Sequence, residues 1–322
     1  MNNIIVIAKK EWKDILRSKM FMYIVLMLIV LTITSLAVSF FVFSSQVNEY
    51  QQSVALLKQL GKEPITPPPR LYPLNLLRGV VDYIEIVGAV LGIMLGYISI
   101  SKERNTKALK ILLTKPLTKK DIAYGKIIGN TFFILILLAI VGILIFLSIF
   151  FIGGIVLTAE ELLKIILFVV FSTIYILLFF MLSFFFTLQQ KTITHALILS
   201  FIIWLIIGLI LPQIGDTMDP DNQVPGGFFH SMNMNKTQEK QVMSKFVGYE
   251  NMRDFIEQLS ITKHYERTVF ALFGIKNTYN DVALSTILAD NLGNMMWIVV
   301  STFIGFFADY LLLLRNKNYL GG

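Results

Sequence analysis

The sequence has 322 residues, of which 55% are hydrophobic and only 15% are charged, and its formal net charge is +7. A soluble globular domain has about 25% charged residues, so this composition excludes an ordinary soluble protein and indicates a membrane protein. The chain has no cysteine, which excludes disulfides, thiol catalysis and cysteine-metal sites.

Residues 1–19 have the pattern of an amphipathic helix. Its apolar positions recur at helical spacing, and basic residues occupy much of the opposite face: Ile4, Ile5, Ala8, Trp12, Ile15 and Leu16 against Lys9, Lys10, Lys13 and Arg17. Such a helix is typical of a membrane surface, with tryptophan at the headgroup boundary and the basic face toward anionic lipid. A topology anchor without a mechanical role is an equally good interpretation.

Six apolar runs are long enough to cross a bilayer, since about 20 helical residues span the hydrocarbon core. They cover residues 20–43, 79–100, 127–152, 162–187, 196–213 and 292–314. The first run is longer than the apolar core of a secretory signal, which has about 7 to 15 residues, so we expect it to be retained. The sequence therefore predicts an all-α polytopic membrane protein with six transmembrane helices.

Basic residues indicate the orientation of these spans. With the N-terminus inside, the inner segments have roughly three times the density of Lys and Arg found in the outer segments, as the positive-inside rule requires. We expect both termini to be cytoplasmic in a cell-membrane protein, with residues 45–77 and 214–291 on the outer side. The extracytoplasmic segment 214–291 is expected to be a small helical domain, and 292–322 holds the last span and a cytoplasmic tail.

The strongly basic loop at residues 101–126 has more organisation than a topology signal requires. Apolar residues near Leu109 and Leu112 predict a short helix that Pro116 ends, and Glu103 lies four residues before Lys107, in the favourable order for an ion pair. Thr118 and Asp121 then have the spacing of a capping box that begins the third span. This pattern favours a docking or mechanical role over topology alone.

Charged and small residues within the spans are the remaining candidates for function. Arg78, Asp82 and Glu85 share one face of a helix near the outer end of span two, either on a substrate pathway or as an interfacial cluster that pairs internally. The second interpretation is the simpler one. Asp309, near the inner end of span six, is expected to pair with a cytoplasmic Arg or Lys.

A glycine stripe follows in span two. Gly88, Gly92 and Gly96 recur every four residues, which predicts close contact with a neighbouring helix.

The order of these elements resembles the permease subunits of ABC-2-type ATP-binding-cassette transporters, a family made up mostly of exporters. The similarity lies in the amphipathic helix of "AKKEWKDILRSKMF", in the loop "ERNTKALKILLTKPLTKKDIAYGKIIGN", and in six spans with enlarged outer segments after the first and fifth. Asn105 and Thr106 stand where many members have glycine after the Glu-Arg pair.

The resemblance implies a set of roles for the loop. Residues 103–114 would form a coupling helix against cytoplasmic ABC ATPase subunits, with contacts from Glu103, Arg104, Lys107, Leu109, Lys110 and Leu112. It also implies a second permease copy or a close relative as partner, membrane lipid around the spans, and no nucleic acid. ATP and Mg would be bound by the ATPase subunits, and no cofactor by this chain.

The sequence lacks the common motifs of nucleotide-binding, zinc and hydrolase sites. It has no Gly-x-x-x-x-Gly-Lys-Ser/Thr loop for phosphate, because Lys120 stands at the first glycine position before Gly125 and Lys126. It also lacks a His-Glu-x-x-His zinc helix and a Gly-x-Ser-x-Gly elbow. We therefore expect a chain without ATPase activity of its own.

Three functions fit these observations. The first is a permease coupled to separate ATPases, and the alternative is a non-transporting anchor or assembly factor for a soluble partner. A secondary transporter ranks third, because the middle of the spans lacks the charges and broken helices of ion coupling.

Overall fold

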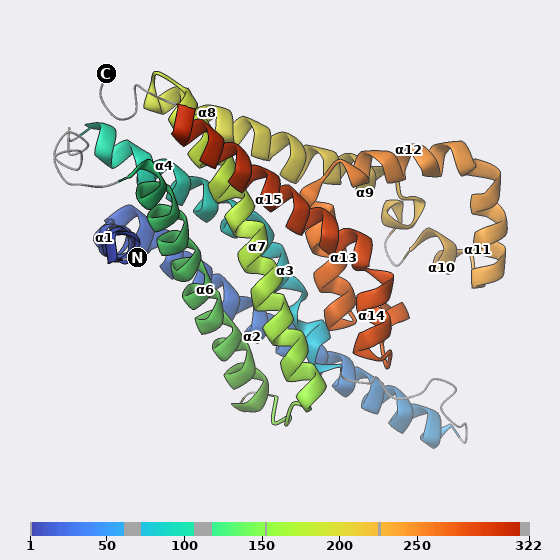
Figure 1. The fold of residues 1–322 in the computed structure, drawn as a ribbon. Helices are drawn as coiled ribbons and strands as arrows, with labels where there is room; N and C mark the ends of the chain where they lie inside the picture. Colours follow the sequence, from blue (N-terminus) through green and yellow to red (C-terminus); the bar gives the residue numbers. More distant parts are fainter. Residues whose placement is uncertain (1, 61–71, 106–117, 152, 225–226, 316–322) are drawn as a thin grey trace.

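The computed structural model describes residues 2–60, 72–105, 118–151, 153–224 and 227–315 (Figure 1). Within these ranges the chain is helical and has no β-strand. Six helical segments are long and apolar enough to cross a membrane: Phe21–Gln59, Pro73–Lys102, Lys120–Phe151, Ala159–Gln189, Ile193–Met218 and Leu292–Leu313. The prediction of an all-α protein with six spans is confirmed.

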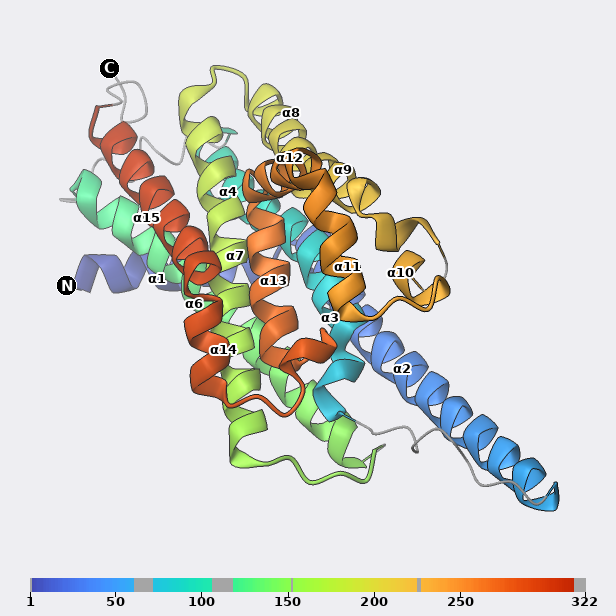
Figure 2. The same ribbon diagram turned by 90° about the vertical axis from the view of Figure 1, so that its right-hand side faces the viewer.

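In the described ranges, the membrane bundle consists mainly of long helices. They are α1 (Asn2–Leu16), α2 (Lys19–Gln59), α4 (Ala89–Asn105), α6 (Lys119–Phe151), α7 (Ala159–Gln189), α8 (Ile193–Trp204) and α15 (Leu292–Arg315). α7 runs through the middle of the bundle, and α1 lies across the other helices at one end (Figures 1 and 2). We call that end, where α4, α7 and α15 finish and α6 begins, the α1 end.

Local sequence fixes where the helices start. Thr118 and Asp121 form the predicted capping box of α6, with both backbone-to-side-chain hydrogen bonds at 3.1 Å. Thr158 and Glu161 form a second capping box at the start of α7. Each box satisfies amide groups that a helix start otherwise leaves without partners.

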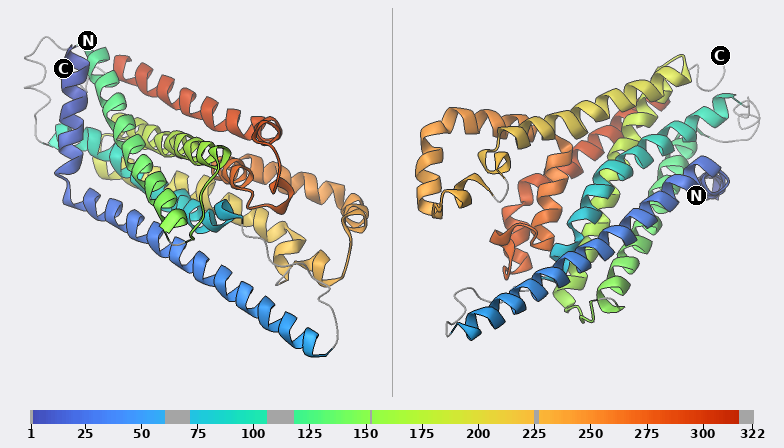
Figure 3. Two further views of the ribbon diagram at one scale, coloured as in Figure 1. Left: turned by 90° about the horizontal axis from the view of Figure 1, so that it is seen from below. Right: turned by 180° about the vertical axis from the view of Figure 1, so that it is seen from behind.

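The first span extends well beyond the predicted residues 20–43. α2 has 41 residues without a break, and in both views of Figure 3 it runs along the edge of the bundle and past it. At about 1.5 Å per residue, its second half lies beyond any 30 Å hydrocarbon core. Residues 61–71 of the outer segment lie outside the described residues.

Spans two and five each contain one wide helical turn. In span two, η1 (Pro73–Leu77) and α3 (Arg78–Tyr83) lead into the π-helix η2 (Ile84–Gly88) before α4. In span five, the π-helix η3 (Leu205–Ile210) joins α8 to α9 (Leu211–Met218). Side chains from other helices bond the carbonyl groups at these turns: Tyr175 Oη donates to Glu85 O at 2.8 Å, and Ser260 Oγ to Ile207 O at 2.7 Å.

The segment at residues 214–291 divides into two parts rather than forming a separate outer domain. The projecting part holds η4 (Pro220–Gln223), α10 (Phe228–Ser231), α11 (Lys236–Met243), η5 (Ser244–Phe246) and α12 (Val247–Gln258) (Figure 1). The other part holds α13 (Ile261–Phe273), η6 (Asn277–Tyr279) and α14 (Leu284–Asp290). α13 packs into the bundle against α7 and α15. Polar residues of α13 find hydrogen-bond partners there, for example Tyr265, whose hydroxyl lies 2.7 Å from that of Ser172.

Candidate functional site

A buried ion pair joins three helices at the α1 end. Lys126 Nζ of α6 lies 2.9 Å from Glu11 Oε1 of α1, and it also donates to the backbone oxygen of Ser99 in α4 at 2.6 Å. Ser99 Oγ donates to the second carboxylate oxygen of Glu11 at 2.9 Å. We call Glu11, Ser99 and Lys126 the buried cluster.

Glycines on α6 allow α1 to come close enough for this pair. A Cβ atom at Gly125 would lie 2.6 Å from Ile7 Cβ, and one at Gly129 would lie 3.0 Å from the backbone of Ala8. Trp12 adds ring contacts with Phe132 and Phe133, whose centroids lie 5.7 and 5.5 Å away. The sequence "GKIIG" therefore supplies both the space and the charge that hold α1 against the third span.

Burial makes the cluster sensitive to the loss of one partner. The Lys126 side chain is fully buried, and that of Glu11 is 4% exposed. A buried charge whose partner is removed costs about 3–5 kcal/mol, because the remaining charge has neither water nor a counter-charge. The pair thus holds α1, α4 and α6 in one arrangement.

Two further basic residues tie the end of α4 to its neighbours. Lys102 Nζ donates to Asp14 O in the last turn of α1 at 2.9 Å. The Arg104 guanidinium donates to the oxygens of Thr187 and Gln190 through Nη1 and to that of Lys191 through Nη2, each at 2.9 Å. Cations at a helix C-terminus satisfy the last carbonyls and the negative end of the helix dipole.

Both ends of the basic loop are therefore fixed to the bundle. α4 ends at Asn105 with contacts to α1 and α7, and α6 begins at Lys119 with Lys126 held in the buried cluster. Residues 106–117 lie outside the described residues, and with them the predicted contacts Lys107, Leu109, Lys110 and Leu112. The side chain of Glu103 lies outside them too, so only Arg104 of the predicted coupling residues has a described side chain.

The sequence model of ABC-2 family transporter proteins matches residues 5–317. The chain belongs to this family. The match covers nearly the whole sequence and identifies a membrane permease of an ABC transporter. A search of proteins with established function found no significant match.

Other predicted site residues of this ABC-2 permease do not meet as expected. The described residues include no ion pair that joins Arg78 to Asp82 or Glu85. Arg78 instead places its guanidinium carbon 5.7 Å from the centre of the Phe270 ring. Arg78 and Asp82 both lie on the regular helix α3, whereas Glu85 lies in the π-helix that begins at Ile84 and so departs from their regular α-helical spacing.

Asp309 does not pair with a basic residue in the described part of the chain. It is fully buried, and neither carboxylate oxygen accepts a hydrogen bond there. Nearby residues on α15 explain why: Thr302 donates to Ile174 O, and a Cβ at Gly305 would lie 3.1 Å from Met181 Cβ. Asp309 continues this α7-facing side of the helix, whereas Arg315 is exposed.

The glycine stripe of span two faces α7. A Cβ at Gly92 or Gly96 would lie 2.4 Å from the backbone oxygen of Ile176 or Phe180, respectively, and one at Gly88 would lie 3.0 Å from the Ile176 side chain. Side chains at these positions would push the two most buried spans apart.

The buried cluster itself was missed from the sequence, although it left a signal. Glu11 lies four residues from both Ile7 and Ile15, so it is an acid within the apolar stripe of an amphipathic helix. Ile7 and Ile15 are buried, and Glu11 is buried between them. A charge at such a position predicts a buried partner, but nothing in the local pattern identifies Lys126.

Proposed function

We propose that this chain is the permease subunit of an ATP-driven exporter, bound through residues 103–114 to two separate ATPase subunits on the α1 side of the membrane. The functional assembly contains two copies of the chain, or one copy and a close relative. The ATPases bind ATP and Mg. The family match supports the transport role, and the asymmetry of Lys and Arg supports a cytoplasmic α1 end.

The observation that carries the proposal is that both ends of the basic loop are fixed to buried parts of the bundle. A force on the loop reaches α7 through Arg104, and it reaches α1 through Lys102 and Lys126. A loop that served only as a topology signal would need positive charge but none of these contacts. These contacts support the proposal that the loop acts as a lever on the spans.

Motion at the α1 end would then spread through the middle of the bundle. α4 and α7 touch at Gly92 and Gly96, where the nearest atoms of α7 are backbone oxygens. Helices packed in this way move together or separate as units. ATPase closure would therefore shift α4 and α7 together and open a path between the two permease copies.

Docking of the loop is tested by Leu109→Asp with Leu112→Asp. Desolvating two charges in an apolar contact costs several kcal/mol, so the double variant should no longer co-purify with an ABC ATPase of the same genome that binds the parent chain. ATP turnover of the co-expressed sample should fall to that of the ATPase alone.

The matched control is Leu56→Asp with Leu60→Asp, two leucines that are 61% and 72% exposed at the opposite end of the molecule. This control should insert, co-purify and stimulate ATP turnover like the parent. Equal assembly and turnover of the loop variant and the parent would leave the loop as a topology signal and favour the anchor function.

A further inference from the structure

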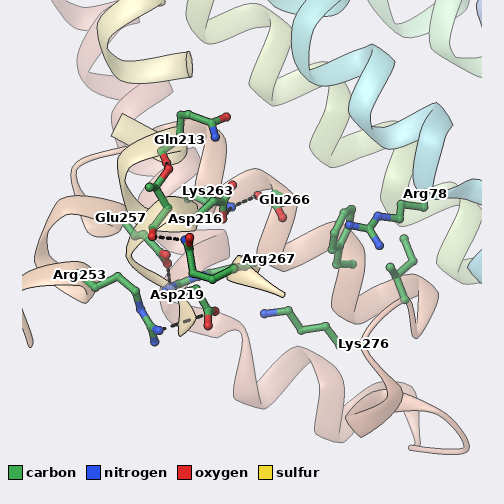
Figure 4. A pocket seen from close by; sticks show the side chains of 14 residues that line it. Arg78, Gln213, Asp216, Asp219, Arg253, Glu257, Lys263, Glu266, Arg267 and Lys276 are labelled. Atoms are coloured by element: carbon green, nitrogen blue, oxygen red, sulfur yellow. Dashed lines mark hydrogen bonds and ion pairs between the residues drawn. The ribbon is translucent and has the colours of Figure 1, made fainter. Parts of the chain in front are cut away.

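A charged cavity of about 650 Å³ lies at the end of the molecule opposite α1, and Figure 4 shows the side chains that line it. Its wall comes from α3 at the start of span two, α9 at the end of span five, and the helices α12 and α13. The cavity therefore lies where two spans meet the segment that follows span five. Neither the family match nor the proposed coupling accounts for it.

The carboxylates of the cavity wall already have basic partners. Lys263 Nζ lies 2.7 Å from both Asp216 and Glu266, Arg253 lies 3.6 Å from Asp219, and Arg267 bonds Glu257. These contacts set three basic residues against four carboxylates, so the paired groups alone keep one negative charge. A net positive charge in the cavity must therefore come from basic residues outside these pairs.

Arg78 and Lys276 supply that charge. Neither forms an ion pair with any carboxylate in the described ranges of the chain. In Figure 4 Lys276 extends its ammonium group into the cavity, and Arg78 lies on the α3 side next to the Phe270 ring. With these two residues the lining has five basic and four acidic side chains, one positive charge in excess. Two cations outside the ion pairs attract an anion and can donate charge-assisted hydrogen bonds to it.

An apolar groove of about 590 Å³ adjoins the cavity on span five. Leu209, Ile210, Ile214 and Met218 line it, and Gln213 and Thr217 line both the groove and the cavity. Ile210 and Ile214 are 50% and 41% exposed on a segment that is long and apolar enough to cross a membrane, so this apolar face suits a hydrocarbon environment. The groove thus leads from the lipid region to the charged cavity.

We propose that this permease binds an anionic amphiphile at the far end of the bundle. Its phosphate or carboxylate head lies between Arg78 and Lys276, and its apolar chain lies along the groove of α9. The proposal goes beyond ATPase coupling and does not depend on it, because the site belongs to the isolated chain.

The test uses the purified full chain in an uncharged detergent and three probes. Lysophosphatidic acid has both a phosphate and one chain, glycerol 3-phosphate has the head alone, and lysophosphatidylcholine has the chain with a zwitterionic head. Calorimetric titration should show binding of lysophosphatidic acid, with at least about tenfold weaker binding of the other two, because each lacks one half of the recognition.

Variants of the cavity and of the groove test where lysophosphatidic acid binds. Arg78→Gln with Lys276→Gln should weaken lysophosphatidic acid binding by about tenfold or more, since each lost cation removes a charge-assisted bond. Lys245→Gln, an exposed lysine that does not line the cavity, is the matched control and should leave binding unchanged. Ile214→Ser in the groove should weaken binding several-fold, whereas Ile206→Ser on the same span should not.

Three results would overturn the proposal. They are equal binding of glycerol 3-phosphate, which would show a soluble-anion site, equal binding of lysophosphatidylcholine, and unchanged binding by the double variant. If the double variant does not fold, Lys276→Gln alone at its exposed position decides the same question. No ATPase is present in any of these measurements, so the outcome is separate from that of the loop experiment.

Discussion

Each end of the molecule has an ion pair between a lysine and a carboxylate, but the two pairs differ in how far they are exposed to solvent. At the α1 end, Lys126 and Glu11 lie 2.9 Å apart with side chains that are 0% and 4% exposed. At the far end, Lys263 and Asp216 lie 2.7 Å apart, but the Asp216 side chain is 43% exposed. The distances are nearly equal, so the contribution of each pair to stability depends on how much water reaches it.

This difference matches the tasks proposed for the two ends. A dry pair strongly resists separation, because either charge alone would be buried without compensation, and this suits a junction that must transmit force. A wetter cluster can exchange a partner for water or for a bound anion at small cost. The far end can therefore bind and release a ligand while the α1 end stays intact.

The largest expected effect is an all-or-none difference in accessibility between the ends. The chain has no native cysteine, so Asn105→Cys and Asn235→Cys give single labels on the two sides. In intact cells an impermeant maleimide should label position 235 only, and position 105 only after the membrane is opened. Labelling of both from one side would contradict the six-span arrangement.

Next in size is the loss of Lys126. Lys126→Met should lower the free energy of unfolding by about 3–5 kcal/mol, because Glu11 would stay buried without a counter-charge. Adding Glu11→Leu should restore most of that loss, since no buried charge is then left. Unfolding by sodium dodecyl sulfate, followed by circular dichroism, measures both, with the exposed Lys120→Met as a control. A double variant as unstable as the single one would show that the pair has no special coupling.

A smaller effect is expected from Lys263 at the far end. Burial lowers the pKa of Lys263, but Glu266 and Asp216 outweigh it and raise the pKa above its usual value. A raised lysine pKa adds stability that is fully present below the unfolded-state value and disappears as the pH rises through the folded-state value.

Lys263→Met should therefore cost only about 1–2 kcal/mol between pH 6 and 9, since solvent screens the pair. The difference from the parent should shrink above about pH 10.5. Parallel melting curves across this range provide the measurement. A difference that grew with pH in the alkaline range would show that the carboxylates do not hold the charge of Lys263.

The smallest effect belongs to Asp309. Asp309→Asn keeps the shape of the side chain and removes the possibility of a buried charge without a partner, so the variant should be as stable as the parent or up to about 1 kcal/mol more stable. Asp290→Asn at an exposed position should change the melting temperature by less. A clear loss of stability in Asp309→Asn would show that the carboxylate has a partner beyond the described residues.

Much of the bundle could be predicted from the sequence because lipid imposes a simple requirement. Long apolar runs must be helices in hydrocarbon, where every backbone polar group needs an internal partner. The capping box at Thr118 and Asp121 was equally readable, because it depends on residues only three apart.

The features that the sequence did not reveal depend on distant contacts. α13 has polar residues such as Tyr265, and the hydrogen bond of Tyr265 to Ser172 on α7 allows this part of the helix to be buried in the bundle. The unbroken continuation of α2 from the first span to Gln59 was not predicted, because the end of an apolar run marks where the chain leaves the hydrocarbon core and not where the helix ends. The pairing of Glu11 with Lys126 joins positions 115 residues apart, which no local pattern can specify.

Because Glu11 and Lys126 are 115 residues apart, Glu11 is synthesised some time before its partner. A ribosome adds about 5–20 residues per second, so Glu11 emerges roughly 6 to 23 seconds before Lys126 exists. Through that interval α1 has no third span to pack against, and its Lys-rich face must keep it on the anionic membrane surface. We therefore expect the basic face of α1 to act as a temporary tether for the nascent chain, until the ion pair forms once α6 has been inserted.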